Sequence, residues 1–125
     1  MAESYKTCLL IDDNYIDNFV TSKLLESFKF ADNVVVHQSS SEAIDALRDG
    51  KVVPDVIFLD LRMPIMDGFE FMQEYEKLDI AKESVKIFML SSSLDPTDLR
   101  KSLANKYITQ FIHKPLTKKV LEELS

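Results

Sequence analysis

The chain has 125 residues, of which 46% are hydrophobic and 29% charged, a composition typical of a globular domain rather than of a disordered segment. Fifteen basic and twenty-one acidic side chains leave a net charge of −6, which argues against non-specific nucleic-acid binding because such binding requires a basic face. We therefore expect a single domain over residues 1–125 that makes no direct contact with nucleic acid.

Cysteine usage and the lack of targeting signals indicate a cytoplasmic protein. Cys8 is the only cysteine, so no internal disulfide can form, and its apolar neighbours favour a small buried hydrophobe. No stretch approaches the ~18–20 consecutive apolar residues of a membrane span. The N-terminal segment MAESYK lacks the apolar core of a signal peptide. We expect no membrane insertion.

Five short apolar runs are expected to form β-strands. They are TCLLI 7–11, NVVVHQ 33–38, DVIFLD 55–60, VKIFML 85–90 and YITQFIH 107–113. The first, third and fourth runs are almost continuously apolar. That pattern is typical of strands that are covered on both faces, as in a parallel sheet.

Helical patterns lie between these runs and after the last one. They cover residues 15–29, 42–49 and 68–78, a segment that starts at 95, and a last segment that starts at Thr117. The first helix carries an apolar stripe typical of a core-facing helix. The stripe consists of Ile16, Phe19, Val20, Leu24 and Phe28. The last helix looks short, so we expect a little more sequence beyond Ser125.

Capping signals support several of these helices. A serine run can supply the N-cap of the second helix. Asp67, followed by Glu70 three positions later, resembles a capping box at the start of the third helix, and Gly68 lies at the helix entry. Asp95 and Pro96 form a favourable start for the fourth helix.

The strict alternation of strand and helix predicts an α/β fold with right-handed crossovers. Five such units suit a flavodoxin-like, doubly wound (βα)5 three-layer sandwich. Its five-stranded parallel sheet would have the order 2-1-3-4-5. In such sheets ligands bind just outside the carboxyl ends of the strands, so the residues that follow each strand are candidates for the functional site.

Polar residues follow four of the five predicted strands. They are Asp12 and Asp13, then Asp60, then the serines 91–93, and finally Lys114 with Pro115. Clustered carboxylates repel one another and need a cation or a proton. Oxygen ligands select a hard ion, so we expect Mg²⁺ at this edge.

The same residue types suit phosphoryl transfer. A carboxylate can act as a nucleophile that accepts a phosphoryl group. The Lys114 ammonium would offset the charge of the transferring group, and the Ser91 hydroxyl could hydrogen-bond the bound phosphate. Ser92 and Ser93 stand beside Ser91 and remain alternatives for that contact.

Four segments carry a family resemblance that spans residues 7–116. LLIDDN, VIFLDLRMPIMDG, IFMLSSS and FIHKP resemble the signature segments of the bacterial two-component response-regulator receiver domain, and the chain looks like a stand-alone, chemotaxis-regulator-like member. The resemblance implies signal transduction by phosphorelay. The phosphoryl group would come from a phosphohistidine on a sensor histidine kinase or phosphotransfer protein, and the receiver would not be an enzyme with a free substrate.

The resemblance also implies roles for the polar residues. Asp60 would be the phosphoacceptor, and Asp13 and Asp60 would ligate Mg²⁺ directly, with the Arg62 backbone carbonyl as a further ligand. Asp12 would act mostly through metal-bound water. Lys114 would pair with the phosphoryl group.

Further positions follow from the same resemblance. Ser91 would be the switch hydroxyl, Phe111 the switch aromatic, and the Lys114–Pro115 peptide bond would be cis. Two features depart from the family pattern. Tyr107-Ile108 stands where receivers often have Gly-Ala, and Phe111 lacks the hydroxyl of a tyrosine. We interpret His37 and His113 as structural residues.

Three other functions compete with this prediction. A haloacid-dehalogenase-like phosphatase needs an acid two residues after its nucleophile, where this chain has Arg62. A flavin carrier needs a phosphate loop where the acidic segment DDNYIDN stands. A receiver used only for docking would not need the acidic set. The output is either protein–protein contact through the fourth helix, fifth strand and fifth helix, or an effector domain that lies outside this sequence; the downstream partner is unknown.

Overall fold

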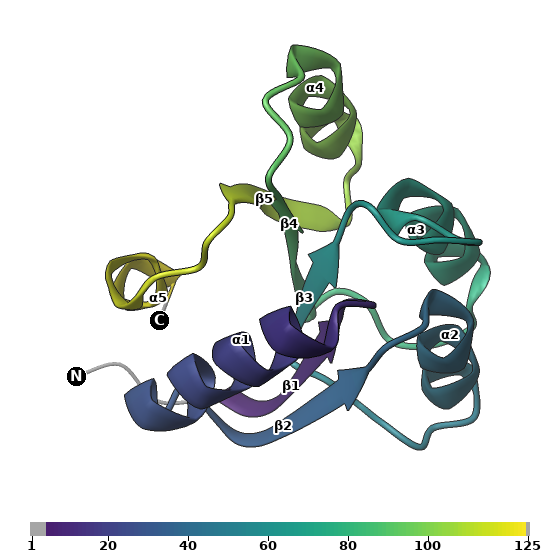
Figure 1. Cartoon of the computed structure of the whole chain (residues 1–125). Coiled ribbons are helices and arrows are strands. Elements are labelled where there is room, and N and C mark those ends of the chain that lie inside the picture. The colour runs from purple at the N-terminus through teal and green to yellow at the C-terminus, as the bar shows by residue number, and fades with distance from the viewer. Residues whose placement is uncertain (1–4, 125) are drawn as a thin grey trace.

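The computed structural model describes residues 5–124. In chain order the elements are β1 (Tyr5–Ile11), α1 (Tyr15–Phe28), β2 (Ala31–His37), α2 (Ser40–Arg48), β3 (Val56–Asp60), α3 (Gly68–Lys77), β4 (Lys86–Ser91), α4 (Pro96–Ala104), β5 (Ile108–His113) and α5 (Lys118–Leu124). The strands form one parallel sheet in the order β2-β1-β3-β4-β5 (Figure 1). The predicted fold class and strand order are confirmed. The expectation of further sequence beyond Ser125 lies outside the described residues.

Two apolar clusters cover the two faces of the sheet. One joins inward side chains of α2 and α3 to alternate residues of the strands, such as Leu9, Ile57 and Met89. The other joins α1 and α5 to the opposite faces of the same strands, through residues such as Phe58 and Leu121. Figure 1 shows the same arrangement, with α1 and α5 on one side of the sheet and α2 and α3 on the other. Strand β3 is buried at every position, and its apolar run ends with the Asp60 carboxylate at the edge of the core.

The predicted caps are present. The Ser39 hydroxyl accepts a hydrogen bond from the Glu42 amide at 3.3 Å at the start of α2. Asp67 and Glu70 form a complete capping box at the start of α3. Asp95 caps α4 with Pro96 in the first turn. None of the helices within residues 5–124 is long and apolar enough to cross a membrane.

The predicted apolar stripe of α1 is wrong for the first half of the helix. Ile16, Phe19 and Val20 are 69%, 57% and 60% exposed, whereas Asn18 and Leu25 are buried. The physical reason is a polar tether at the start of the helix. The Asn18 side-chain amide donates to the Asp12 carbonyl at 2.7 Å, and this contact turns the apolar residues of the first turns toward solvent.

The loop after β3 makes a close turn that depends on Gly68. Its amide donates to the Leu61 carbonyl at 2.8 Å. A Cβ atom at this position would lie 3.0 Å from the Asp60 carbonyl oxygen, the Leu61 Cα and the Met89 sulfur. Two of these atoms belong to the backbone next to Asp60, so they cannot move without moving the site.

We therefore expect Gly68→Ala to lower the free energy of unfolding by about 1–3 kcal/mol through overpacking. Gly50→Asn is a matched control, because Gly50 has a positive φ of 73° with nothing near its Cβ position and asparagine tolerates that conformation. Urea unfolding of both variants checks the prediction. A Gly68→Ala variant as stable as the wild type would contradict the close packing described here.

Candidate functional site

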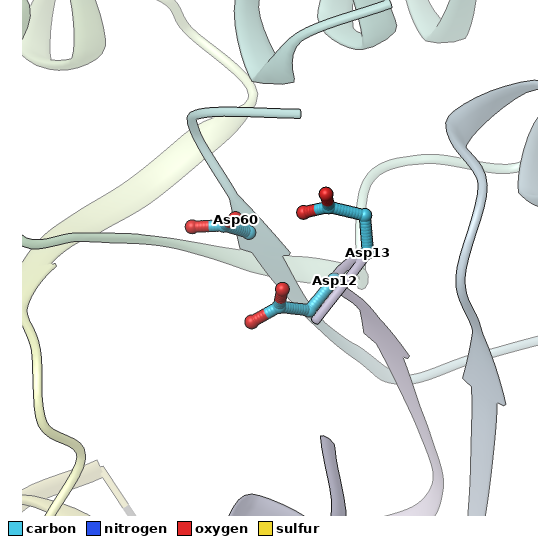
Figure 2. A group of neighbouring side chains, drawn as sticks. All are labelled: Asp12, Asp13 and Asp60. Carbon is cyan, nitrogen blue, oxygen red and sulfur yellow. The ribbon is translucent and has the colours of Figure 1, made fainter. Parts of the chain in front are cut away.

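Three carboxylates gather where β1 and β3 end side by side. Asp12 and Asp13 follow β1 directly, and Asp60 is the last residue of β3. Each offers an oxygen within 4.8 Å of the others (Figure 2). Asp12 and Asp60 are 3% and 7% exposed, whereas Asp13 is exposed to solvent. The pairing of two parallel strands thus brings together acids that lie far apart in the sequence.

The Lys114 ammonium lies among these acids. Its Nζ atom is 3.0 Å from an Asp12 carboxylate oxygen, 3.0 Å from an Asp60 oxygen and 3.3 Å from an Asp17 oxygen. The side chain starts beyond the end of β5, which is separated from β3 by β4. One positive charge therefore faces several negative ones, and the site keeps an excess of negative charge.

Burial and the neighbouring charges together shift the pKa of Asp60. The pKa is raised to about 6, chiefly by burial and in smaller part by the charges of Asp12 and Asp13, against the opposing hydrogen bond and charge of Lys114. Burial acts to lower the pKa of Lys114, but hydrogen bonds to Asp60 and Asp12 outweigh it and raise the pKa. The ammonium is thus held in its charged form, whereas Asp60 is ionised reluctantly without a second cation.

The loop between β1 and α1 fixes the direction of Asp12. One of its carboxylate oxygens accepts the Asn14 amide at 2.9 Å and the other accepts Lys114. The Asn18 amide holds the Asp12 backbone carbonyl from α1. Asp17 and Asn18 were missed in the sequence. Their position in the first turn of the helix after an acidic pair is the signal that could have found them.

The serines after β4 differ in their surroundings. Ser91 is 1% exposed, and its hydroxyl accepts the Ser93 amide at 2.9 Å. Ser92 is exposed. The Ser93 hydroxyl donates to Asp98 of α4 at 2.7 Å. Of the three, Ser91 is therefore the buried hydroxyl at the strand end.

The other residues with roles predicted from the sequence lie around the carboxylate cluster or at the surface. The Arg62 guanidinium pairs with Asp98 at 2.5 Å, a contact that the sequence did not indicate. Phe111 is half-buried and packs against the cluster of α2 and α3. The Lys114–Pro115 peptide bond is cis. His113 is exposed.

His37 and Cys8 lie away from the carboxylates. The His37 ring nitrogen is 3.9 Å from a Glu42 oxygen at the surface. Cys8 is fully buried, and burial raises the pKa of its thiol to about 12. Both surroundings agree with structural roles. The only group of three or more potential metal-binding acid, histidine or cysteine side chains within residues 5–124 is the Asp12, Asp13 and Asp60 cluster.

Comparison with known proteins identifies the family. The model of the response regulator receiver domain matches residues 8–124, so the chain belongs to the response-regulator receiver family, the signalling domains of two-component systems. The chemotaxis protein CheY of Halobacterium salinarum is 28% identical over 111 residues, 88% of each chain.

Solved structures agree with this assignment. A response regulator receiver protein from Dyadobacter fermentans is 37% identical, with a TM-score of 0.84 over 95% of this chain and 94% of that one. The receiver domain of the sensor histidine kinase PA1611 from Pseudomonas aeruginosa has the same fold, with 20% identity and a TM-score of 0.78 over 95% and 93% of the two chains. That structure carries a magnesium ion in its active-site cleft.

The raised pKa of Asp60 leads to a prediction about stability. The pKa of about 6 in the folded protein exceeds the usual 3.8, so the folded state binds more protons than the unfolded state between these values. Stability contributed by Asp60 is therefore present at low pH and lost as the pH rises through 6. We expect Asp60→Asn, without divalent cations, to raise the free energy of unfolding by about 1–3 kcal/mol at pH 7.5.

The gain should shrink toward pH 5, where the wild-type carboxyl group is largely protonated. Urea unfolding in EDTA at both pH values measures it, with Asp45→Asn on the exposed surface of α2 as the control. A destabilised Asp60→Asn variant at pH 7.5 would show that burial and the neighbouring acids do not disfavour the ionised Asp60 carboxylate as described.

Proposed function

We propose that Asp60 is the phosphoacceptor of this receiver domain, within a single domain that extends over residues 1–125. The observation that carries the proposal is the juxtaposition of the Asp60 carboxylate with Asp12, Asp13 and the Lys114 ammonium. The Lys114 ammonium pairs with the Oδ1 atom of the Asp60 carboxylate, and within residues 5–124 no hydrogen bond engages the other carboxylate oxygen, which leaves that oxygen available for chemistry. Family membership supports the same role.

In the proposed reaction an Asp60 carboxylate oxygen forms a bond to phosphorus. The phosphorus–nitrogen bond of the donor phosphohistidine breaks, and its electron pair returns to the imidazole, which takes up a proton. The Lys114 ammonium stabilises the negative charge on the transferring phosphoryl oxygens. The Ser91 hydroxyl rotates to donate a hydrogen bond to a phosphoryl oxygen. Phe111 then changes its packing when the loop after β4 changes position.

The donor set fits Mg²⁺. Asp12, Asp13 and Asp60 offer only oxygen atoms, and their mutual repulsion adds to the effect of burial in raising the pKa of Asp60. We propose that Asp13 and Asp60 hold the ion with the Arg62 backbone carbonyl, and that Asp12 acts through a bound water. When bound, the ion neutralises charge on the phosphoryl group. The magnesium ion of the PA1611 receiver supports this assignment.

We also propose that the phosphoryl donor is a sensor histidine kinase or a phosphotransfer protein that docks against the first turns of α1. Tyr15, Ile16, Phe19 and Val20 expose apolar surface right after the acidic loop. Exposed apolar patches of this kind mark protein contacts. The domain would act as a cytoplasmic signalling switch rather than as an enzyme with a free substrate, and it would present its changed surface to a downstream protein.

Acetyl phosphate with Mg²⁺ tests the site without a protein partner. We expect the wild type to gain one phosphoryl mass and Asp60→Asn to gain none. Lys114→Ala should slow the reaction by more than tenfold, because it removes the cation that faces the phosphoryl oxygens. Intact-mass spectrometry measures all three. Equal labelling of Asp60→Asn and the wild type would contradict the assignment.

A second experiment tests the donor surface. For any purified phosphotransfer domain that labels the wild type, Phe19→Ser should lower the rate of transfer by about tenfold, while labelling by acetyl phosphate stays unchanged. Val53→Ser is a matched control, since Val53 is 78% exposed and lies in the loop before β3, at the opposite end of that strand from Asp60. Unchanged transfer to Phe19→Ser would rule out docking on this face.

A further inference from the structure

Helix α4 differs from the other helices in what it buries. Its buried residues are Asp98 and Ser102, both polar, while Leu99 and Leu103 are 42% and 63% exposed. The Ser102 hydroxyl is occupied within the helix, where it donates to the Asp98 carbonyl at 2.9 Å. No apolar side chain of α4 therefore belongs to the two core clusters. Figure 1 shows α4 standing apart from α3 and α5.

The Asp98 carboxylate connects α4 to the functional site. One of its oxygens accepts both the Arg62 guanidinium at 2.5 Å and the Ser93 hydroxyl at 2.7 Å. The Asp98 side chain is 7% exposed, whereas that of its partner Arg62 is 62% exposed, so the contact lies at the protein surface. The hydrogen bond from Ser93 and the charge of Arg62 hold the pKa of Asp98 below its usual range. Lys101 makes a weaker contact over the Phe69 ring at 5.3 Å.

Both partners of Asp98 stand two residues from a proposed site residue. Arg62 follows Asp60 by two positions, and Ser93 follows Ser91. The Ser93 amide donates to the Ser91 hydroxyl, and the Ser93 hydroxyl in turn accepts the Asp95 amide at 3.1 Å. A continuous set of hydrogen bonds thus runs from the buried Ser91 hydroxyl through Ser93 to α4, and returns through Arg62 to the loop that follows Asp60.

We propose that Arg62, Asp98 and Ser93 form a latch that holds α4 and the loop after β4 in the arrangement of the unmodified protein, and that a phosphoryl group on Asp60 weakens this latch. Asp98 is then a positioning residue that sets how easily the domain switches. The proposal rests on the proposed phosphorylation of Asp60.

Two physical effects make the latch sensitive to Asp60. A phosphoryl group on Asp60 adds negative charge and strong acceptor oxygens two positions along the chain from Arg62, and these would compete with Asp98 for the guanidinium. It also draws the Ser91 hydroxyl toward itself, and the Ser93 amide is bonded to that hydroxyl. Because coupling between two equilibria is reciprocal, anything that weakens the latch in advance must tighten the binding of a phosphoryl group or its mimic.

Beryllofluoride binding to the full chain with Mg²⁺ tests this coupling. We expect Asp98→Ala and Asp98→Asn to lower the Kd for beryllofluoride about three- to tenfold, the range expected for one charge-assisted contact with an exposed partner. Ser93→Ala should also lower the Kd for beryllofluoride, but by a smaller factor. The Kd for Mg²⁺ alone should change less than twofold, because these variants leave the Asp12, Asp13 and Asp60 carboxylates unchanged. Titration calorimetry measures both constants.

Asp45→Ala removes an exposed ion pair with Arg48 on α2 and serves as the matched control, with an unchanged Kd expected. A merely structural role for Asp98 would leave beryllofluoride binding unchanged or weaken it. Unchanged or weaker beryllofluoride binding by a folded Asp98 variant overturns the latch. If both Asp98 variants fail to fold, unchanged or weaker binding by Ser93→Ala overturns it. Failure of the wild type to bind beryllofluoride overturns the phosphoacceptor assignment instead, and the latch with it.

Discussion

The main electrostatic constraint on this site is the repulsion among the Asp12, Asp13 and Asp60 carboxylates. The single Lys114 ammonium offsets this repulsion only in part. Like charges in a partly buried site are costly unless a cation or a proton neutralises them. The pKa of Asp60 is raised mainly by burial and in smaller part by the charges of Asp12 and Asp13. Such a cluster at the end of the fully buried strand β3 supports the proposal that the domain binds a divalent cation and accepts a phosphoryl group there.

Helix α4 is held differently from the other four helices. Apolar clusters on the two faces of the sheet anchor α1, α2, α3 and α5, whereas the buried residues of α4 are Asp98 and Ser102, and Asp98 joins the helix to Arg62 and Ser93. Apolar packing responds little to a new charge nearby, but an ion pair does. Under the proposed latch, a change of charge at Asp60 would therefore act on α4 while the sheet that positions Asp60 stays in place.

The sequence predicted most of this arrangement, because apolar runs, caps and strand-end polar residues are local signals. The Asp67–Glu70 capping box and the order of the strands are examples. The exposed face of α1 was not predictable, since it depends on a contact between the Asn18 side chain and the Asp12 carbonyl. The pairing of Arg62 with Asp98 joins the loop after β3 to helix α4, 36 positions along the chain, and only the folded chain shows that they meet.

Proton release on Mg²⁺ binding tests the central claim most directly. Because the pKa of Asp60 is about 6, the carboxyl group is roughly half protonated at pH 6, and a cation that binds there must displace that proton. Calorimetric titration in buffers of different ionisation enthalpy should show about half a proton released per Mg²⁺ at pH 6 and almost none at pH 8. Mg²⁺ binding without proton release at pH 6, or no binding at either pH, would contradict the account.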